Sequence, residues 1–315
     1  MKLENINNVA IVGTGMIGAS MAVLFTGNGY RTTMLAVDET EAQAGLNRYD
    51  GYYKDLVEKK LVTNEQVTIC RKYLGVTQCY SNLANADIII ECVVENLDVK
   101  HSVYKKVDEH CKQYRVLAST TSAISANDLS KGHSAKDRLV VAHPYNPPHL
   151  VPCIEIVPSS FTSAETLETI NEFYLSVGRA PVAMKKSAPG FIANRLQHAL
   201  YREAVYMVEA GITTPEAIDR ALQTSFTPRY TSIGIFEHFD YAGLDMIVSI
   251  EDYLFPTLCN ADKTQDLIRD RCESGDLGFK TGQGVYDWGA KDADDFRRRA
   301  SEPYFRFFNW TLPTE

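Results

Sequence analysis

The chain has 315 residues and a formal net charge of −8, from 32 Lys and Arg residues against 40 Asp and Glu residues. This acidic balance excludes a protein that follows nucleic-acid backbones, because such a protein needs a basic face to displace counterions. Hydrophobic residues make up 45% and charged residues 23% of the chain, as in ordinary globular proteins, and the length predicts about two domains.

The first part of the chain alternates short β-rich runs with stretches of helical character, up to about Val182. This alternation predicts an α/β fold in which a parallel sheet is covered by helices on both faces. The expected strands are Val9–Val12, Thr32–Leu35, Ile88–Ile90, Val116–Ala118, Leu139–Ala142, Ile154–Ile156 and a last one near Val182.

Three glycines follow the first expected strand in the spacing Gly-x-Gly-x-x-Gly. Gly13 permits a tight turn, Gly15 lets the backbone approach a pyrophosphate, and Gly18 lets the following helix pack closely on the strand. The start of that helix, with Met16 and Ile17, favours the anionic diphosphate. Such glycines also occur in ordinary turns, but their place between a strand and a helix favours a Rossmann-type, doubly wound, dinucleotide-binding domain.

The carboxylate that usually binds the adenosine ribose is displaced in this sequence. Its expected position, at the end of the second strand, falls on Ala36, and the first acidic residue after it is Asp38. Asp38 either takes this role in a shifted turn or only belongs to the acidic helix start 38–41. Because no Arg or Lys follows Ala36 to pair with a 2′-phosphate, we expect NAD rather than NADP.

Polar residues stand at the ends of three later strands, where open α/β sheets bind their ligands: the run Ser119–Ser122, then His143, then Glu155. A single histidine in such a place is more often structural, but the three groups together favour catalysis. A dehydrogenase needs a base near pH 7 to take the hydroxyl proton, and the ordinary pKa of imidazole, about 6.5, suits this. A buried carboxylate on its far nitrogen would fix the tautomer, while hydroxyl and amide groups could hold the substrate oxygen.

A Ser–His–acid hydrolase is the rival interpretation of these residues. It requires an activated serine in a Gly-x-Ser-x-Gly elbow, and neither Ser122 nor any other serine of the chain has that context. We therefore favour the dehydrogenase.

The β-rich runs stop at about Ser187, and residues 190 to about 260 carry apolar side chains at helical spacing. We expect a sheet domain, residues 1–187, followed by an all-helical C-terminal domain, residues 188–315. The C-terminal stretch has Arg297–Arg299 and then aromatic residues from Tyr304 to Trp310. It is expected to form a helical tail whose aromatic residues dock on the body of the protein or on a partner subunit.

No stretch approaches the roughly 20 apolar residues of a membrane span, and the N-terminal residues run directly into a strand rather than a signal segment. The seven cysteines are scattered and include no Cys-x-x-Cys pair, and the seven histidines lack metal-ligand spacing. We expect a cytoplasmic protein with reduced thiols, no metal, no nucleic-acid partner and no membrane contact.

Ordered motifs run through nearly the whole chain, at residues 12–18, 91–100, 119–122, 143–147, 189–195, 240–245 and 278–286. Together they resemble the L-3-hydroxyacyl-CoA dehydrogenase family, including its L-gulonate 3-dehydrogenase (lambda-crystallin) and L-carnitine dehydrogenase branch. The resemblance implies a Rossmann-type domain that binds NAD. It also implies a helical domain that closes the substrate site and forms most of a homodimer interface.

The resemblance further implies roles for individual residues. His143 corresponds to the general base and Glu155 to the carboxylate that orients it. Ser122 and Asn194 correspond to the groups that hydrogen-bond the reacting oxygen of the substrate. The positions expected to line the cofactor are Glu95, Lys100 and Asn146.

These cofactor positions also have structural alternatives. Glu95 and Lys100 could form a surface pair at the start of a helix, and Asn146 could only shape a Pro-rich turn. A non-catalytic dinucleotide-binding protein, either structural or a sensor, is the alternative from another class. The complete set of catalytic positions argues against it, whereas Ala36 favours weakened cofactor binding.

The sequence leaves the small-molecule substrate open between an acyl-CoA thioester and a free hydroxy acid such as L-gulonate or L-carnitine. Binding of an acyl-CoA needs basic groups for the phosphates of coenzyme A. Lys54, Lys59 and Lys60 could be these groups, or they could form the solvent-exposed face of a helix. The segments after His143 and Asn194 look closer to the gulonate and carnitine branch, while residues 277–286 resemble hydroxybutyryl-CoA enzymes. We place the thioester slightly ahead, because it is the commonest substrate in the family.

Overall fold

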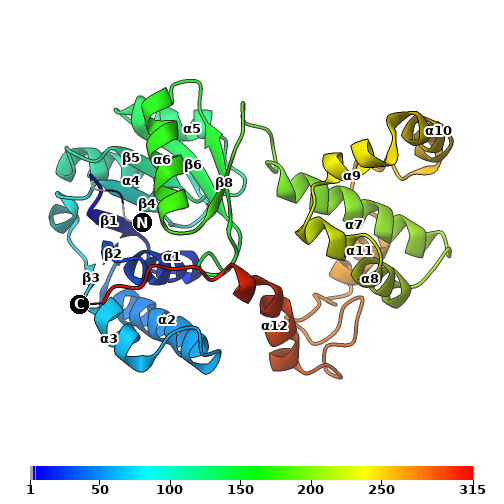
Figure 1. Ribbon diagram of the computed structural model, residues 1–315, viewed down its shortest axis with the longest axis horizontal. Coiled ribbons are helices and arrows are strands. Elements are labelled where there is room, and N and C mark those ends of the chain that lie inside the picture. The colour runs from blue at the N-terminus through cyan, green and yellow to red at the C-terminus, as the bar shows by residue number, and fades with distance from the viewer. Residues whose placement is uncertain (1–2, 4, 315) are drawn as a thin grey trace. The chain divides into compact units, whose positions relative to one another are not determined.

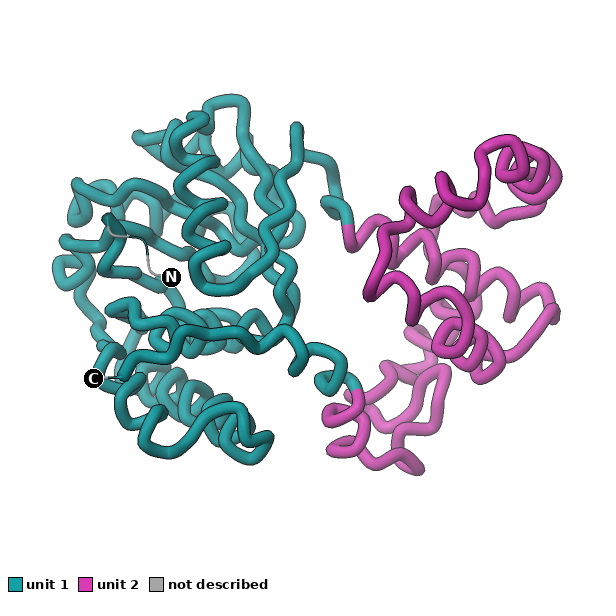
Figure 2. The backbone as a smooth tube through the Cα atoms, in the orientation of Figure 1, with its two compact units in different colours: residues 1–192, 300–315 teal, residues 193–299 magenta. Residues whose placement is uncertain are grey.

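The computed structural model describes residue 3 and residues 5–314. The chain divides into two compact units, Met1–Ile192 with Ala300–Glu315, and Ala193–Arg299 (Figure 2). The division in the middle of the chain lies close to the predicted boundary at 187. The C-terminal segment, which we expected with the helical domain, groups instead with the first unit.

The first unit is built on an eight-stranded sheet with the strand order β3-β2-β1-β4-β5-β6-β7-β8 (Figure 1). Every expected strand lies within an observed one, and the edge strand β3 is additional. β3 was missed because it is short and interrupted by Gly75. The strands are β1 Asn8–Val12, β2 Arg31–Leu35, β3 Leu74–Thr77, β4 Ile88–Glu91, β5 Val116–Ser119, β6 Leu139–Pro144, β7 Cys153–Pro158 and β8 Ala180–Ala183.

The sheet is parallel from β3 to β6, but β7 runs antiparallel to β6, which corrects the expectation of a wholly parallel sheet. The reason is the short link 145–152 between these two strands, since a parallel neighbour needs a crossover of about a dozen residues or more. β8 returns parallel to β7 after a helical crossover. The antiparallel pairing places His143 directly opposite Glu155 in the ladder.

Helices cover both faces of this sheet, as predicted for a doubly wound fold. They are α1 Met16–Gly27, α2 Glu39–Glu58, α3 Asn64–Arg71, α4 Leu97–His110, α5 Ala126–Lys131 and α6 Ala164–Ser176. Alternate residues of β1 point to opposite faces, so that Ile11 belongs to one hydrophobic cluster and Val12 to the other. Phe25 and Phe173 bring α1 and α6 into the first cluster, and Tyr104 brings α4 into the second.

The aromatic residues of the C-terminal segment dock on the body of the protein, in the first unit. The sequence alone leaves this open against docking on a partner subunit. Trp310 is buried, joins the first hydrophobic cluster and packs against Gly27 at the end of α1. The backbone N–H of Thr311 donates to Oδ1 of Asn28 (3.2 Å), and Nζ of Lys59 lies 3.7 Å from Oε2 of Glu302. The tail is therefore part of the core of the first unit.

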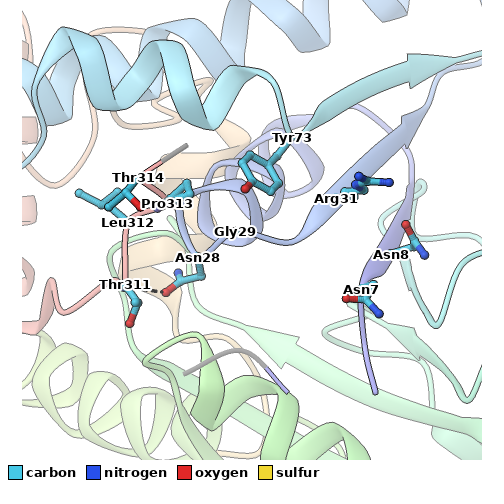
Figure 3. Close-up of a pocket in the computed structure, with 10 residues that line it drawn as sticks. All are labelled: Asn7, Asn8, Asn28, Gly29, Arg31, Tyr73, Thr311, Leu312, Pro313 and Thr314. Carbon is cyan, nitrogen blue, oxygen red and sulfur yellow. Dashed lines mark hydrogen bonds between the residues drawn. The ribbon is translucent and has the colours of Figure 1, made fainter. Parts of the chain in front are cut away.

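A hollow of about 900 Å³ lies beside this tail at the amino-terminal ends of β1 and β2 (Figure 3). In a parallel sheet this is the edge opposite to the carboxyl ends of the strands, where ligands of such folds bind. It is lined by Asn7, Asn8, Asn28, Gly29, Arg31, Tyr73 and residues 311–314.

The second unit consists of helices joined by loops, which agrees with the predicted all-helical domain. Its helices are α7 Ala193–Glu209, α8 Pro215–Thr224, α9 Ile235–Ala242, α10 Leu244–Leu254, α11 Asp266–Glu273 and α12 Ala293–Ser301, the last of which ends in the first unit. In the part of the chain that the structure describes, no helix combines the length and apolar character needed to cross a membrane.

Candidate active site

The glycine-rich turn has the backbone geometry that the sequence predicts. Gly13 has a φ of +109°, and a Cβ there would lie 2.6 Å from the carbonyl oxygen of Cys92. A Cβ on Gly18 would collide with the carbonyl oxygen of Gly13, so α1 packs closely on the turn. A Cβ on Gly15 would meet no atom within 4 Å, which leaves open space beside the backbone at this position.

The start of α1 differs from the starts of the other helices of the first unit. Each of α2 to α6 begins at a residue whose side-chain oxygen accepts a backbone N–H: Asp38, Thr63, Asn96, Ser125 and Ser163. α1 begins at Gly15 without a side-chain cap. Met16, in its first turn, is 62% exposed, while Ile17 packs on the core. Uncapped N–H groups beside an open glycine fit the diphosphate of a dinucleotide.

Asp38 is used as a helix cap. Its Oδ1 accepts the backbone N–H of Glu41 at 2.8 Å, which matches the second of the two roles that the sequence left open. Ala36 is buried, and its N–H donates to the carbonyl oxygen of Thr77, so the chain reaches Asp38 only after β2 has ended. Contact of Asp38 with a ribose stays a prediction.

His143 and Glu155 form a buried pair at the carboxyl end of β6. Nδ1 of His143 lies 2.8 Å from Oε2 of Glu155, and the two residues are 7% and 0% exposed. Oε1 of Glu155 accepts the backbone N–H of Ile192 at 2.8 Å, so both carboxylate oxygens are engaged. An ionised carboxylate can only accept, so this contact favours the tautomer with the proton on Nδ1, which leaves Nε2 as the basic nitrogen.

Ser122 lies in the loop after β5 and is tied to the loop after β4 through Glu95. Oε1 of Glu95 accepts the backbone N–H groups of Ser122 (3.2 Å) and Ala123 (3.1 Å) and the hydroxyl of Thr121. Burial raises the pKa of Glu95, but the Thr121 hydroxyl and the charge of Lys100 outweigh it, so the pKa lies below its usual value. Glu95 is therefore an ionised latch between two loops at the carboxyl edge of the sheet.

Lys100 is not on the surface, which excludes the alternative of a surface pair with Glu95. Its side chain is 1% exposed, and Nζ lies 2.7 Å from Oε1 of Glu91 and 3.4 Å from Oε2 of Glu95. Sequence reasoning missed Glu91 as a partner. An acidic residue that ends the apolar run Ile88–Ile90 was the available signal, because such a residue is buried only when it is paired.

The remaining predicted residues have the following positions. Asn146 is exposed and follows the end of β6 closely. Asn194 is half-buried in the first turn of α7, in the second unit. The first unit thus brings together the glycine turn, the Glu95–Lys100–Ser122 group and the His143–Glu155 pair, all at the carboxyl ends of the neighbouring strands β1, β4, β5 and β6.

Comparison with known proteins relates both parts of the chain to the same kind of enzyme. Residues 8–187 match the family model of the NAD binding domain of 3-hydroxyacyl-CoA dehydrogenase. Residues 190–288 match the model of the C-terminal domain of 3-hydroxyacyl-CoA dehydrogenase.

Individual relatives differ in the substrates that their names give. The chain is 31% identical over 285 residues to 5-formyl-3-hydroxy-2-methylpyridine 4-carboxylate 5-dehydrogenase of Mesorhizobium japonicum, covering 89% of this chain and 90% of that protein. It is 33% identical over 239 residues to L-carnitine dehydrogenase of Oceanobacillus iheyensis, covering 75% and 76%. A crystal structure of a 5-formyl-3-hydroxy-2-methylpyridine 4-carboxylic acid 5-dehydrogenase has a TM-score of 0.83 and 28% identity, covering 96% of each chain.

Proposed function

The chain belongs to the 3-hydroxyacyl-CoA dehydrogenase family of NAD-dependent oxidoreductases that act on CH–OH groups, and we propose that it interconverts an L-3-hydroxy compound and its 3-keto product. The observation that supports this most directly is the buried His143–Glu155 pair, 2.8 Å apart at the carboxyl edge of the sheet. The open backbone at Gly15 and the uncapped start of α1 fit NAD at the same edge.

In this proposal His143 is the general base. Glu155 holds the proton on Nδ1, so that Nε2 takes the proton of the substrate hydroxyl, and the carboxylate stabilises the imidazolium that forms. Bound NAD, held at the glycine turn, would supply the acceptor for the hydride that leaves the carbon of this hydroxyl. Ser122, positioned by Glu95, hydrogen-bonds the reacting oxygen, and Asn146 lines the cofactor. The same role of Asn194 as a partner of the reacting oxygen is carried over from the family resemblance and stays a prediction.

The replacement His143→Gln tests the reaction type. We expect kcat to fall by about two to four orders of magnitude, the usual contribution of a positioned general base. The affinity for NADH, measured by fluorescence titration, should stay nearly unchanged, because the cofactor residues are intact. His110→Gln, at the end of α4, is the matched control and should keep wild-type turnover. Retained activity in His143→Gln would refute the assignment of the base.

For the substrate we propose a small free hydroxy acid rather than a thioester. Two of the three lysines considered for the phosphates of coenzyme A have acidic partners: Nζ of Lys54 lies 3.9 Å from Glu58, and Nζ of Lys59 lies 3.7 Å from Glu302. These carboxylates weaken the attraction of the two lysines for the phosphates of coenzyme A. The names of the two relatives above, which specify carnitine and a pyridine carboxylate, support the same choice.

A short-chain 3-hydroxyacyl-CoA is the second candidate, supported by the match of residues 8–187 and 190–288 to models of 3-hydroxyacyl-CoA dehydrogenase. NAD reduction with L-gulonate and L-carnitine, run beside NADH oxidation with acetoacetyl-CoA, separates the two. Turnover of the thioester alone would overturn our choice of substrate. Binding of NADH without turnover of any of these compounds would favour a non-catalytic dinucleotide-binding protein.

We further propose that the protein is a cytoplasmic homodimer. All seven cysteines lie among the described residues and are free thiols, as expected in a reducing compartment. The helices α9 and α10 of the second unit have large apolar side chains that are strongly exposed, among them Phe236, Tyr241 and Tyr253. A second copy of the chain would cover them.

A further inference from the structure

Glu91, at the end of β4, is completely buried and has no part in the proton transfer proposed above. Four donors converge on its carboxylate. Oε1 accepts from Nζ of Lys100 (2.7 Å) and from the N–H of Val93 (2.9 Å). Oε2 accepts from the hydroxyls of Tyr104 (2.9 Å) and Ser119 (2.7 Å). A carboxylate with both oxygens satisfied in this way is rigidly held, because every rotation would leave buried donors unpaired.

The contacts continue from Glu91 towards the loop of the site. Lys100, which is buried, lies between Glu91 and Glu95, and its shorter contact is with Glu91. Glu95 in turn accepts the backbone N–H groups of Ser122 and Ala123. Glu91 is thus joined to the backbone of Ser122 through one ammonium group and one carboxylate.

We propose that Glu91 is a positioning residue of the dehydrogenase site, which holds Lys100 and through it fixes Glu95 and the loop that carries Ser122. The role of Ser122 in this statement rests on the function proposed above. The electrostatic argument is that a buried ammonium group requires a close, desolvated counter-charge. Glu95 is 40% exposed and 3.4 Å from Nζ, so Glu91 is the partner that keeps Lys100 in place. Without Glu91, Lys100 is drawn towards Glu95, and Glu95 is displaced from the N–H groups of Ser122 and Ala123.

The replacement Glu91→Gln tests this role with little disturbance of the fold. The hydroxyls of Tyr104 and Ser119 can turn to accept from the new amide, while Lys100 loses the closer and more buried of its two charged partners. In the protein without cofactor we expect the amides of Ser122 and Ala123 to exchange hydrogen about tenfold faster, relative to amides of β5. We expect kcat to fall between about tenfold and a hundredfold, because the displaced loop misplaces a group that binds the substrate.

Tyr104→Phe is the matched control. It removes a donor from the same carboxylate but leaves the contact of Oε1 with Lys100 intact. We expect a lower stability without a selective change of exchange at Ser122 or of kcat. If Glu91→Gln and Tyr104→Phe changed exchange and kcat in proportion to their losses of stability, Glu91 would be only structural and the proposal would be wrong.

A double-mutant cycle with Lys100→Met shows whether Glu91 acts through Lys100. The effect of Glu91→Gln on exchange at Ser122 should largely disappear when Lys100 is already Met. In that background no ammonium group joins Glu91 to Glu95, so a change at Glu91 no longer reaches the loop. An equal effect in both backgrounds would overturn the proposed route. The exchange measurement does not depend on any substrate, so it decides the role of Glu91 even if the proposed reaction is wrong.

Discussion

His149 is buried in the first unit although it lies only a few residues after the proposed base. Its Nδ1 is 2.7 Å from Oγ of Ser20, and Oγ of Ser20 also accepts the backbone N–H of His149 (3.1 Å). The ring and the Ser20 hydroxyl therefore share one hydrogen bond within a buried environment. Burial, with a further contribution from the charge of Arg179, lowers the pKa of His149 to about 3.

This histidine makes the stability of the protein depend on pH. The unfolded state, with a pKa near 6.5, takes up a proton that the folded state excludes, so stability falls as pH falls from 6.5 towards 3. We expect the loss of unfolding free energy between pH 7 and pH 5 to be smaller by about 2 kcal/mol in His149→Asn, because the amide can hydrogen-bond Ser20 but does not titrate. Urea unfolding at both pH values measures the difference, and equal losses in the two proteins would contradict it.

At the level of residues, the sequence pointed to polar groups that follow strands, but not to their buried partners. His143 and Glu155 were expected together because a base needs an orienting carboxylate, and the structure pairs them. Glu91 was missed because its partner Lys100 is brought to it by the path of the chain from β4 into α4. Residue spacing alone does not distinguish such a buried pair from a surface pair.

At the level of elements, the strands could be predicted more easily than their directions. The alternation of β-rich and helical segments located β1, β2 and β4 to β8. The antiparallel direction of β7 follows from the short connection 145–152, which contains no crossover helix, and the expectation of a wholly parallel sheet overlooked it. This direction matters for the site, because it sets His143 opposite Glu155.

The docking of the C-terminal segment on α1 gives a prediction at the same scale. Replacement of Gly27 by Ala would normally stabilise a helix by about 0.5 to 1 kcal/mol. Here the new Cβ would lie 2.6 Å from Cζ3 of Trp310, so we expect Gly27→Ala to lower the unfolding free energy by about 1 to 3 kcal/mol. In a Trp310→Ala background the same change should be neutral or stabilising. Urea unfolding of the wild type, the two single variants and the double variant tests this reversal. The same loss of unfolding free energy in both backgrounds would show that Trp310 does not pack on Gly27.

At the scale of the whole molecule, the helices α9 and α10 of the second unit leave large apolar side chains uncovered. The structure describes no fully buried residue in α9 or α10, whereas α1 of the first unit is buried along almost its whole length. Large apolar side chains left exposed on two consecutive helices are typical of surfaces that bind a partner. Helical spacing in this region could be read from the sequence, but which apolar residues remain uncovered could not, because that depends on the packing of the unit.

We therefore expect size-exclusion chromatography with light scattering to give twice the mass of one 35.2 kDa chain. Tyr241 and Phe236 are 93% and 89% exposed, so charging both, as in Phe236→Glu/Tyr241→Glu, should produce monomers without unfolding the sheet unit. Leu175→Glu is the control, because Leu175 is 55% exposed on α6 of the first unit and should leave the dimer intact. A monomeric wild-type protein at micromolar concentrations would mean that another partner covers α9 and α10. A monomeric double variant with an intact NADH site would instead locate the interface on these helices and separate assembly from cofactor binding.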